Sequence, residues 1–515
     1  MLLGAASYIC AMFIRKNKNR SGTVSIQIIS KTGRQNKVIE TIGCARTLQE
    51  EEVLLNKART EIEHLQGLQT LFVEHDDSVV DSFVDSLCQD NLQIVGAELI
   101  LAQIYDNIGY PQDNGLYLFR NLVLCRLVYP GSKLKTVEYF KKHLNLDISV
   151  YSVYRFLDHL QSQHKQNIED ITFAHTQKLL NGKTGVVFYD MTTLYFEASE
   201  EDDFRITGYS KDGKHQQPQI VIGLLVGHNG YPIGYEVFEG NTSETKTLIP
   251  VLEVFQKRFN LEKPIIVADA ALLSQKNIDA LVTGGYQYIL GGRLKNESDR
   301  IKKMVLDLQI KEGSPRQVKH PNGRLIVTFS KDRARNDMYN REKGLKRLEK
   351  KVKKGRLSKE HINNRGYNKY LKLDGKIAIS IDYEKFALDN VWDGLKGYIT
   401  NTELTKEQVI GNYGQLWQIE KAFRISKTDL RIRPIYHRIK ERIEAHLCIC
   451  FCAYKVYKEL ERLLKKNNIA LSPEKALAEI NQLQQLTYVL PKSRHVKTKL
   501  LRPTQNQLLL LNMKF

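Results

Sequence analysis

Three acidic residues, far apart in the chain, stand where their side chains could act together on a phosphate ester. Asp190 ends the apolar run 186–189, Asp269 ends the apolar run 264–268, and Glu420 lies in a segment with helical periodicity. Carboxylate oxygens are the ligands that Mg²⁺ prefers, and two ions roughly 3.5–4 Å apart can stabilise the attacking and leaving oxygens of a phosphoryl transfer. A lone Asp after a strand is more often a cap or turn residue, so the three together are the informative feature.

The distribution of charge favours a polyanionic partner. The 515 residues hold 77 Lys and Arg against 58 Asp and Glu, a formal charge of +19. Residues 331–372 hold 16 basic against 5 acidic residues, and residues 421–442 hold 8 against 2. A solvated surface helix is the alternative interpretation of each run. Two runs close in sequence to the third carboxylate favour nucleic acid.

Cysteine usage and hydropathy disfavour a zinc site and a membrane span. The seven Cys residues have no zinc-ligand spacing, and Cys448, Cys450 and Cys452 alternate in an apolar run typical of a buried helix. An odd number of Cys residues without a framework suits free thiols in a reducing cytosol. No apolar segment reaches about 20 residues. The apolar start, residues 1–14, lacks a signal peptide's positive flank and is predicted to lead into a strand. We therefore expect a folded, soluble, cytoplasmic protein.

The N-terminal part is predicted to be a small β meander, residues 1–45, followed by a helical region, residues 46–182. Three β-like segments separated by turn residues form the meander: 11–15, 23–30 and 37–42. Within the helical region, Lys133–Lys142 and Val150–Leu160 could be the paired helices of a DNA-reading module. Ordinary helix packing is the alternative. We expect residues 46–182 to bind DNA ends.

The period changes to that of strands after residue 183. The predicted order is three strands, a helix, a strand, a helix and a strand, with bounds 186–189, 219–226, 231–237, 243–259, 264–268, 274–283 and 286–290. This order is that of the ribonuclease H-like fold. The first and fourth strands then lie side by side and parallel, so Asp190 and Asp269 face one crevice. Residues 183–292 form the first part of this core.

The rest of the chain is predicted to contain an insertion, the second part of the core and a tail. Residues 293–404 form an inserted basic β-rich subdomain with strands at 325–329 and 377–381 and a helix near 343–359. Residues 405–466 supply the second part of the core, with one helix over 409–427 and another over 438–464. Residues 467–515 form a helical tail. The fold class is α/β, with a ribonuclease H-like catalytic core, an inserted β-rich subdomain and a mainly helical N-terminal region.

The helix predicted over 409–427 has two different faces. One face is made of residues spaced 4, 3, 4 and 3 apart, which a helix brings to the same side: Tyr413, Trp417, Glu420, Arg424 and Lys427. An apolar stripe on the other side is made of Leu416, Ile419 and Phe423. The helix can therefore pack on one side and present chemistry on the other.

The segment from Tyr413 to Lys427 resembles the Tyr-x2-Arg-x3-Glu-x6-Lys signature of DDE transposases of the insertion sequence 4-like superfamily. The likeness is best to the branch typified by insertion sequence 1634. Four further motifs extend it over nearly the whole chain: Asp190 in Phe-Tyr-Asp-Met-Thr-Thr, Gly-Asn-Thr-Ser-Glu ending at Glu244, Asp269 in Val-Ala-Asp-Ala-Ala, and Arg-Pro-Ile-Tyr-His starting at Arg433.

The resemblance implies that the three carboxylates bind two Mg²⁺ ions, with Mn²⁺ as a substitute. It also implies that Tyr413 and Lys427 contact phosphates of the transposon end. The signature's Arg is Leu416 here, so its contact is absent or supplied by another side chain, for which Arg424 is the candidate. Trp417 either stacks on an unpaired base or packs in the helix core. We also expect two cations of the second basic run to bind DNA, Arg431 and Arg433.

The expected function is that of a transposase that cleaves double-stranded DNA at the terminal inverted repeats of an insertion sequence. The freed 3′ ends are then joined to target DNA by the same metal-assisted phosphoryl transfer. A homodimer in the synaptic complex and a bacterial, nucleoid-associated cytoplasmic location follow from this expectation. One alternative is a nuclease of the same fold without strand transfer. The other is an inactive or co-opted sequence-specific DNA-binding protein, for which Leu416 leaves room.

Overall fold

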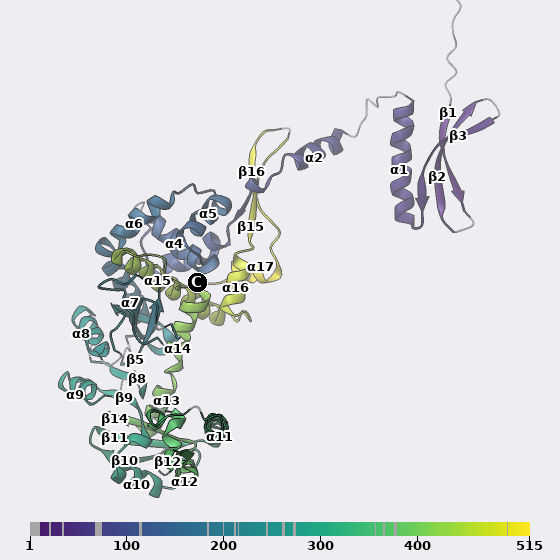
Figure 1. Cartoon of the computed structure of the whole chain (residues 1–515). Helices are drawn as coiled ribbons and strands as arrows, with labels where there is room; N and C mark the ends of the chain where they lie inside the picture. The colour runs from purple at the N-terminus through teal and green to yellow at the C-terminus, as the bar shows by residue number, and fades with distance from the viewer. Residues whose placement is uncertain are drawn as a thin grey trace, which may run out of the picture. The chain divides into compact units, whose positions relative to one another are not determined.

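The chain divides into two compact units, residues 1–89 with 488–497 and residues 90–487 with 498–515 (Figure 1). The computed structural model describes residues 11–19, 22–32, 35–66, 75–112, 116–182, 185–198, 200–210, 213–214, 216–243, 246–259, 263–270, 274–355, 357–363, 366–374, 378–491 and 493–515. The predictions for residues 1–10 and for Glu244 lie outside these ranges. No helix among the described residues is long and apolar enough to cross a membrane.

The first unit is a three-stranded antiparallel sheet with a helix packed on it. The elements are β1 (Ala11–Lys18), β2 (Val24–Thr32), β3 (Gln35–Ala45), α1 (Leu48–Leu65) and α2 (His75–Asp85). Alternate residues of β2 point to one face, and Ile26 and Ile28 are buried there against Ala58 of α1. Thr47 caps α1 by accepting a hydrogen bond from the Glu50 N–H. The three strands lie where the sequence predicts them.

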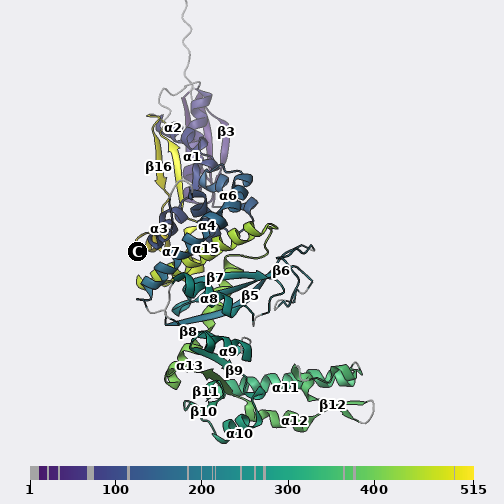
Figure 2. The same cartoon turned by 90° about the vertical axis from the view of Figure 1, so that its left-hand side faces the viewer.

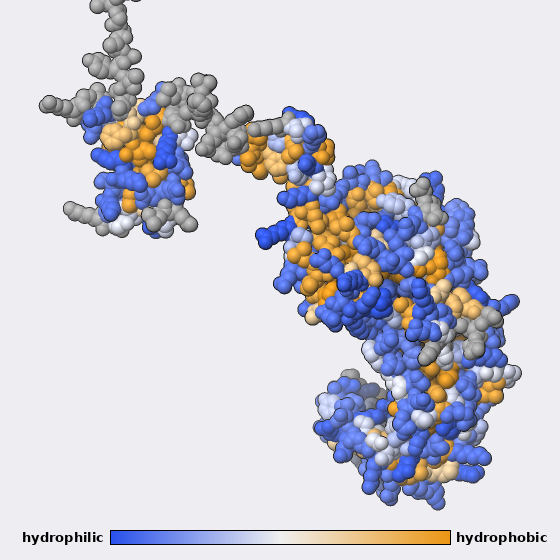
Figure 3. Space-filling model, turned by 180° about the vertical axis from the view of Figure 1, so that it is seen from behind, coloured by the Kyte–Doolittle hydropathy of each residue, from blue (hydrophilic) through white to orange (hydrophobic). Residues whose placement is uncertain are grey.

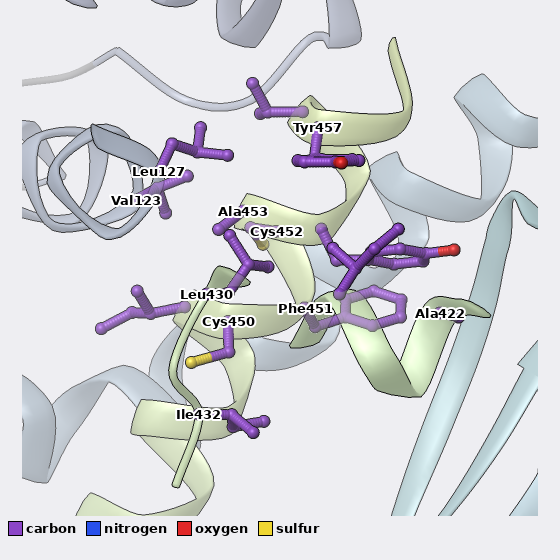
Figure 4. Packing of buried hydrophobic residues seen from close by; sticks show 14 of the residues in the cluster. Val123, Leu127, Ala422, Leu430, Ile432, Cys450, Phe451, Cys452, Ala453 and Tyr457 are labelled. Atoms are coloured by element: carbon purple, nitrogen blue, oxygen red, sulfur yellow. The ribbon is translucent and has the colours of Figure 1, made fainter. Parts of the chain in front are cut away.

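The second unit begins with helices that pack around one long buried helix, α15 (Lys440–Lys466). The preceding elements are β4 (Leu92–Ile94), a π-helical turn (Ala97–Leu101), α3 (Ala102–Ile108), α4 (Tyr117–Val128), α5 (Lys133–Leu144), α6 (Val150–Gln163) and α7 (Lys165–Leu179). In Figure 4, Val123 and Leu127 of α4 lie beside Cys452 and Ala453 of α15. The three cysteines of α15 are buried free thiols, as the sequence predicts.

An eight-stranded sheet forms the centre of the second unit, in the order β10-β11-β14-β9-β8-β5-β6-β7. Its strands are β5 (Val186–Tyr195), β6 (Gln219–Val226), β7 (Pro232–Glu239), β8 (Ile265–Ala268), β9 (Tyr288–Gly292), β10 (Arg316–His320), β11 (Gly323–Phe329) and β14 (Leu395–Thr400). Strands β5, β6 and β7 are antiparallel, whereas β8 is parallel to β5 and β9 is parallel to β8. These five strands have the ribonuclease H-like arrangement that the sequence predicts.

Helices cover both faces of this sheet because its strands are apolar on both sides. One face carries Phe188 and Val267. It packs against α15 and the helices from α3 to α7 that surround α15. The opposite face carries Val187 and Ile266 and packs with α8 (Leu248–Phe259), α9 (Gln275–Thr283) and α10 (Asp299–Asp307). Side chains alternate between the two faces along each strand, so a polar residue lies on the same face as the residue two positions before it.

The region predicted over 293–404 as an inserted β-rich subdomain is partly continuous with the central sheet. Strands β10, β11 and β14 extend the central sheet, because β14 pairs with the edge of β9 and β11 pairs with β14. The rest comprises α11 (Lys331–Lys353), the hairpin β12 (Leu371–Asp374) and β13 (Ala378–Ile381), and α12 (Tyr383–Leu388). Figure 2 shows α11 extending away from the sheet beside this hairpin, and Figure 3 shows that this part of the unit is mostly hydrophilic.

Three further details correct the predictions. Strand β5 continues past Asp190 to Tyr195, because all eight residues from 188 to 195 pair with β6. The single helix predicted over 409–427 is broken into α13 (Lys406–Gly414), α14 (Trp417–Arg424) and a π-helical turn (Ile425–Asp429). The tail predicted as helical also contains strands, since α16 (Pro473–Ile480) and α17 (Gln505–Leu511) flank β15 (Gln484–Val489) and β16 (Val496–Leu500), which form a sheet with β4.

Candidate active site

Asp190 and Asp269 occupy matching positions on two paired parallel strands. Residues Val186, Val187 and Phe188 of β5 pair with Ile265, Ile266 and Val267 of β8. Continuing this register by two residues brings Asp190 opposite Asp269, which directly follows β8. Both carboxylates are half-buried, and the Met191 N–H donates to Asp190 Oδ1 over 2.8 Å. The alternation of the strands places both residues on the face that carries Phe188 and Val267.

Glu420 lies on α14, which packs over β5 and β6 on that same face. The apolar stripe of the helix makes this contact, since Leu416, Ile419 and Ala422 are buried while Glu420 is exposed. The three carboxylates therefore share one face of the sheet. The break after Gly414 lets α13 lie over β8, β9 and β14 while α14 follows β5.

The charges of two of the carboxylates, Asp269 and Glu420, both act on the side chain of Tyr413. Its side chain is buried at the end of α13, and burial raises its pKa to about 12, with the charge of Asp269 and then that of Glu420 adding to the rise. The hydroxyl approaches the backbone of β9, where a Cβ on Gly291 would lie 2.5 Å from it. Glycine is therefore required at this position for the tyrosine to fit. A phenol with so high a pKa remains a hydrogen-bond donor at neutral pH.

The donor chemistry fits divalent cations, but the carboxylates do not converge on one point. Among the described residues there is no group of three or more His, Cys, Asp or Glu side chains that could hold a metal ion. Three carboxylates on one face supply the oxygen ligands that Mg²⁺ prefers.

The other side chains of the predicted binding face are distributed differently. Trp417 is 51% exposed, so it does not pack in the helix core, and the Lys421 ammonium lies 5.9 Å from its ring centre. Arg424 is exposed on the same helix. Lys427 is half-buried and borders an apolar cavity with Phe423. Of the single face predicted from Tyr413 to Lys427, only Trp417, Glu420 and Arg424 lie on one continuous helix. The helix breaks between Tyr413 and Trp417 and becomes π-helical after Arg424.

Arg431 and Arg433 lie beyond α14 and border a different cavity. Arg431 is exposed and has a positive φ of 44°, a conformation that costs a non-glycine residue free energy. The Arg433 guanidinium lies 5.4 Å from the ring centre of Tyr195, the last residue of β5. These two arginines are therefore separate from the group around Glu420.

Two cations of the inserted region reach the candidate site, although the sequence did not single them out. Lys396 of β14 lies with its ammonium 4.5 Å from the ring centre of Tyr413. Burial and then the charge of Arg333 lower the pKa of Lys396, while Glu420 acts in the opposite direction. Lys396 and Arg333 also line a cavity of about 260 Å³ with Arg293 and Lys295. The basic composition of 331–372 was a signal for Arg333, but nothing local in the sequence marked Lys396.

The sequence over residues 181–455 matches the family described as the transposase DDE domain. This match spans more than half of the chain and contains Asp190, Asp269 and Glu420. The chain belongs to the transposase DDE domain family. The family match begins just before β5 and ends within α15, so it includes the sheet, the insertion and both helices of the candidate site. No curated protein sequence matches the chain significantly.

Solved structures of three transposase complexes are similar to parts of this chain. A cryo-EM structure of the piggyBac transposase synaptic complex with hairpin DNA is 10% identical in sequence, with a TM-score of 0.39, over 75% of this chain and 76% of that chain. The Mos1 transposase paired-end complex with the left transposon end is 14% identical, with a TM-score of 0.16, over 35% of this chain and 60% of that chain. A Mos1 mariner paired-end complex with Mn is 13% identical, with a TM-score of 0.15, over 47% and 77% of the two chains.

Proposed function

We propose that the protein is a transposase of the insertion sequence 4-like superfamily, nearest to the insertion sequence 1634 branch. It cleaves double-stranded DNA at the terminal inverted repeats of its own element and joins the 3′ ends to target DNA. The observation that carries the proposal is the placement of Asp190 and Asp269 at matching positions of β5 and β8, with Glu420 above the same face. Because two ends must be brought together, the proposed working form is a homodimer.

Asp190, Asp269 and Glu420 are the residues that would hold two Mg²⁺ or Mn²⁺ ions. Such ions, when bound, stabilise the charge on the attacking and leaving oxygens of an in-line phosphoryl transfer. The protein contributes rigid placement, because two of the carboxylates come from paired strands of a buried sheet. The third comes from α14, which packs on the same face of the sheet.

The surrounding side chains are proposed to hold DNA phosphates. Tyr413 offers a phenolic donor, and Lys396 and Arg333 offer positive charge beside it. Arg424 is one turn after Glu420 and exposed, so it can make the contact that Leu416, which is buried, cannot make. These cations offset the repulsion between the carboxylates and the DNA backbone.

Cleavage of the element's own ends tests the proposal. The DNA that flanks the coding sequence supplies the substrate, and Mg²⁺-dependent nicking at the inverted repeats is measured on labelled duplexes. We expect Asp190→Asn and Glu420→Gln each to lower the cleavage rate about 1000-fold or more while leaving DNA binding intact. Glu407→Gln, an exposed residue on α13, is the matched control and should cleave normally. Undiminished cleavage by the first two variants would exclude these carboxylates from catalysis.

A second assay separates transposition from simpler activities. Ends already cut to expose a 3′-hydroxyl are incubated with a supercoiled target plasmid, and joined products are counted. A transposase joins them, whereas a nuclease of the same fold cuts uncut ends but yields no joined product. A protein that binds the ends without metal-dependent turnover in either assay would be a DNA-binding protein with an inactive site.

A further inference from the structure

A basic cavity lies apart from the carboxylates, between the helical region and the segment that follows α14. Its volume is about 780 Å³, and it is bordered by the end of α4, the start of α5 and residues 431–437. None of its lining residues is Asp or Glu. The charged and titratable side chains around it include Arg126, Lys133, Lys135, Arg431, Arg433 and His437. The cavity is therefore strongly positive and has no acidic residue of its own.

Two of these cations are buried without a counter-ion. Arg126 is 4% exposed and Lys133 is 5% exposed, and both line the cavity. Within the described residues, neither side chain makes a hydrogen bond or an ion pair. Buried charges in proteins are normally paired, because an isolated ion loses its hydration without compensation. An anion in the cavity would pair with Arg126 and would favour the charged form of Lys133, which burial alone disfavours.

The first turn of α5 adds a second source of positive potential. Ser132 caps the helix by accepting from the Lys135 N–H, and Ser132, Lys133 and Leu134 all line the cavity. The first amide groups of a helix have no partner within it, and together with the helix dipole they favour a bound anion. A tetrahedral oxyanion can receive hydrogen bonds from these amides, from the Lys133 ammonium and from a guanidinium.

The two histidines near the cavity do not carry the charge. Burial and then the nearby Lys133 lower the pKa of His437 to about 3, and the same causes lower the pKa of His446 well below its ordinary value. His446 Nε2 lies 3.1 Å from the Ile432 carbonyl oxygen. Both imidazoles are neutral at pH 7. The positive charge of the site therefore comes from its arginines and Lys135, while Lys133, whose pKa burial lowers to about 7, is charged in part.

We infer that this cavity is a phosphate-binding site and that its occupant is a backbone phosphate of the DNA on which the protein acts. The choice of DNA as the source rests on the proposed function. Arg433 connects the cavity to Tyr195, which lies five residues after Asp190 on β5, or about 16 Å along the strand. This distance is less than one turn of B-DNA, about 34 Å, so one duplex can contact the cavity and the carboxylates together.

The test uses the full-length chain, with Lys133→Met as the informative variant and Lys142→Met as the control. Lys142 is exposed on the same helix and does not line the cavity, so its loss removes a lysine without touching the site. Thermal unfolding is followed in increasing sodium phosphate at constant ionic strength. A ligand that binds only the folded state raises Tm with its concentration. We expect this rise in the wild type and in Lys142→Met and a much smaller one in Lys133→Met.

Duplex DNA binding is the second arm and identifies the source of the phosphate. Fluorescence anisotropy with a labelled duplex of random sequence should show a loss of affinity of about 10-fold in Lys133→Met, and a salt slope smaller by about 0.9 for the one lost contact. Equal phosphate-induced shifts in the wild type and Lys133→Met would overturn the site. A phosphate effect that depends on Lys133, with unchanged DNA affinity, would overturn DNA as the source and assign a free phosphate.

Two further variants keep the outcome clear. Arg126→Met is measured in the same way if Lys133→Met does not fold, and the same losses are expected. Asp190→Asn leaves the cavity intact and should bind phosphate as the wild type does. If DNA cleavage fails in every assay but the phosphate effect persists, the proposed function is wrong and the site stands. If cleavage is normal and Lys133→Met changes nothing, the site is wrong and the function stands.

Discussion

The Lys396 ammonium lies 4.5 Å from the ring centre of Tyr413, which joins the inserted region to the helix that precedes Glu420. Lys396 belongs to β14, and Tyr413 ends α13. The cation faces an aromatic ring on one side and the charge of Glu420 nearby. The insertion is thus part of the candidate active site through a side chain, as well as through its strands.

Loss of the Lys396 charge should reduce DNA cleavage by the protein. In Lys396→Met the side chain keeps its length, so packing against Tyr413 is retained while the charge near the DNA is removed. We expect cleavage at the ends to fall about 10-fold, equivalent to about 1.4 kcal/mol. The rate is measured on labelled ends under single-turnover conditions. Lys385→Met, an exposed lysine on α12, should cleave at the wild-type rate, and equal losses in the two variants would refute a specific role.

Removing Trp417 should weaken binding of unpaired DNA while the protein stays folded. The ring is 51% exposed, so Trp417→Ala should lower the free energy of unfolding by about 1–2 kcal/mol, from the half of the side chain that packs. Stacking on a base contributes roughly 1–3 kcal/mol, so affinity for a duplex with a single-stranded flank should fall at least about 5-fold. Anisotropy with flanked and blunt duplexes measures the difference. Tyr117→Ala, which removes another exposed aromatic side chain, is the control. If Trp417→Ala lowers the affinity for flanked and blunt duplexes equally, Trp417 does not stack on an unpaired base.

The stability of the protein should depend on pH through Lys133. Burial and then Arg126 lower its pKa to about 7, against about 10.4 in an unfolded chain. Between these values the unfolded state binds more protons, so the free energy of unfolding rises with pH by up to about 1.4 kcal/mol per unit. Below pH 7 the lysine is charged in both states, and the cost of burying it is fully present.

Lys133→Met should therefore be more stable than the wild type at pH 7 and should have a flatter pH profile between 7 and 10. Urea unfolding followed by circular dichroism measures both quantities. Groups that face Lys133 include Arg126 and Cys125 of α4 and Cys450 of α15. Lys455 has a similarly lowered pKa and supplies the slope that remains. A wild-type profile retained in full by Lys133→Met would show that this lysine is not the source.

The basic residues of α11 should act on DNA through long-range charge. Lys346 and Lys350 are exposed on this helix, so replacing both by Gln should leave thermal unfolding unchanged. Each phosphate contact that is lost should lower the slope of log affinity against log salt by about 0.9. Binding of a random duplex at several salt concentrations gives this slope. An unchanged slope would show that α11 is a solvated surface helix without DNA contact.

The sequence predicts the strands and helices that form the core of the site, because their apolar periodicity is strong. It does not predict the break before Trp417, since no residue from 409 to 427 is a helix breaker by type except glycine. The break follows from tertiary packing, because α13 and α14 must cover different strands. Strand β10 was also missed, since only His320 of its five residues is buried. Lys396 could not be found because its position depends on the pairing of β14 with β9.

The extension of the central sheet by β10, β11 and β14 limits how this protein can be re-engineered. A swap of the whole interval 293–404 for that of another transposase would cut through paired strands and expose the edge of β9. The part from α11 to β13 has its own small core around Leu348 and Tyr370. Exchange points next to Phe329 and Leu395 therefore leave the sheet intact and define the modular portion.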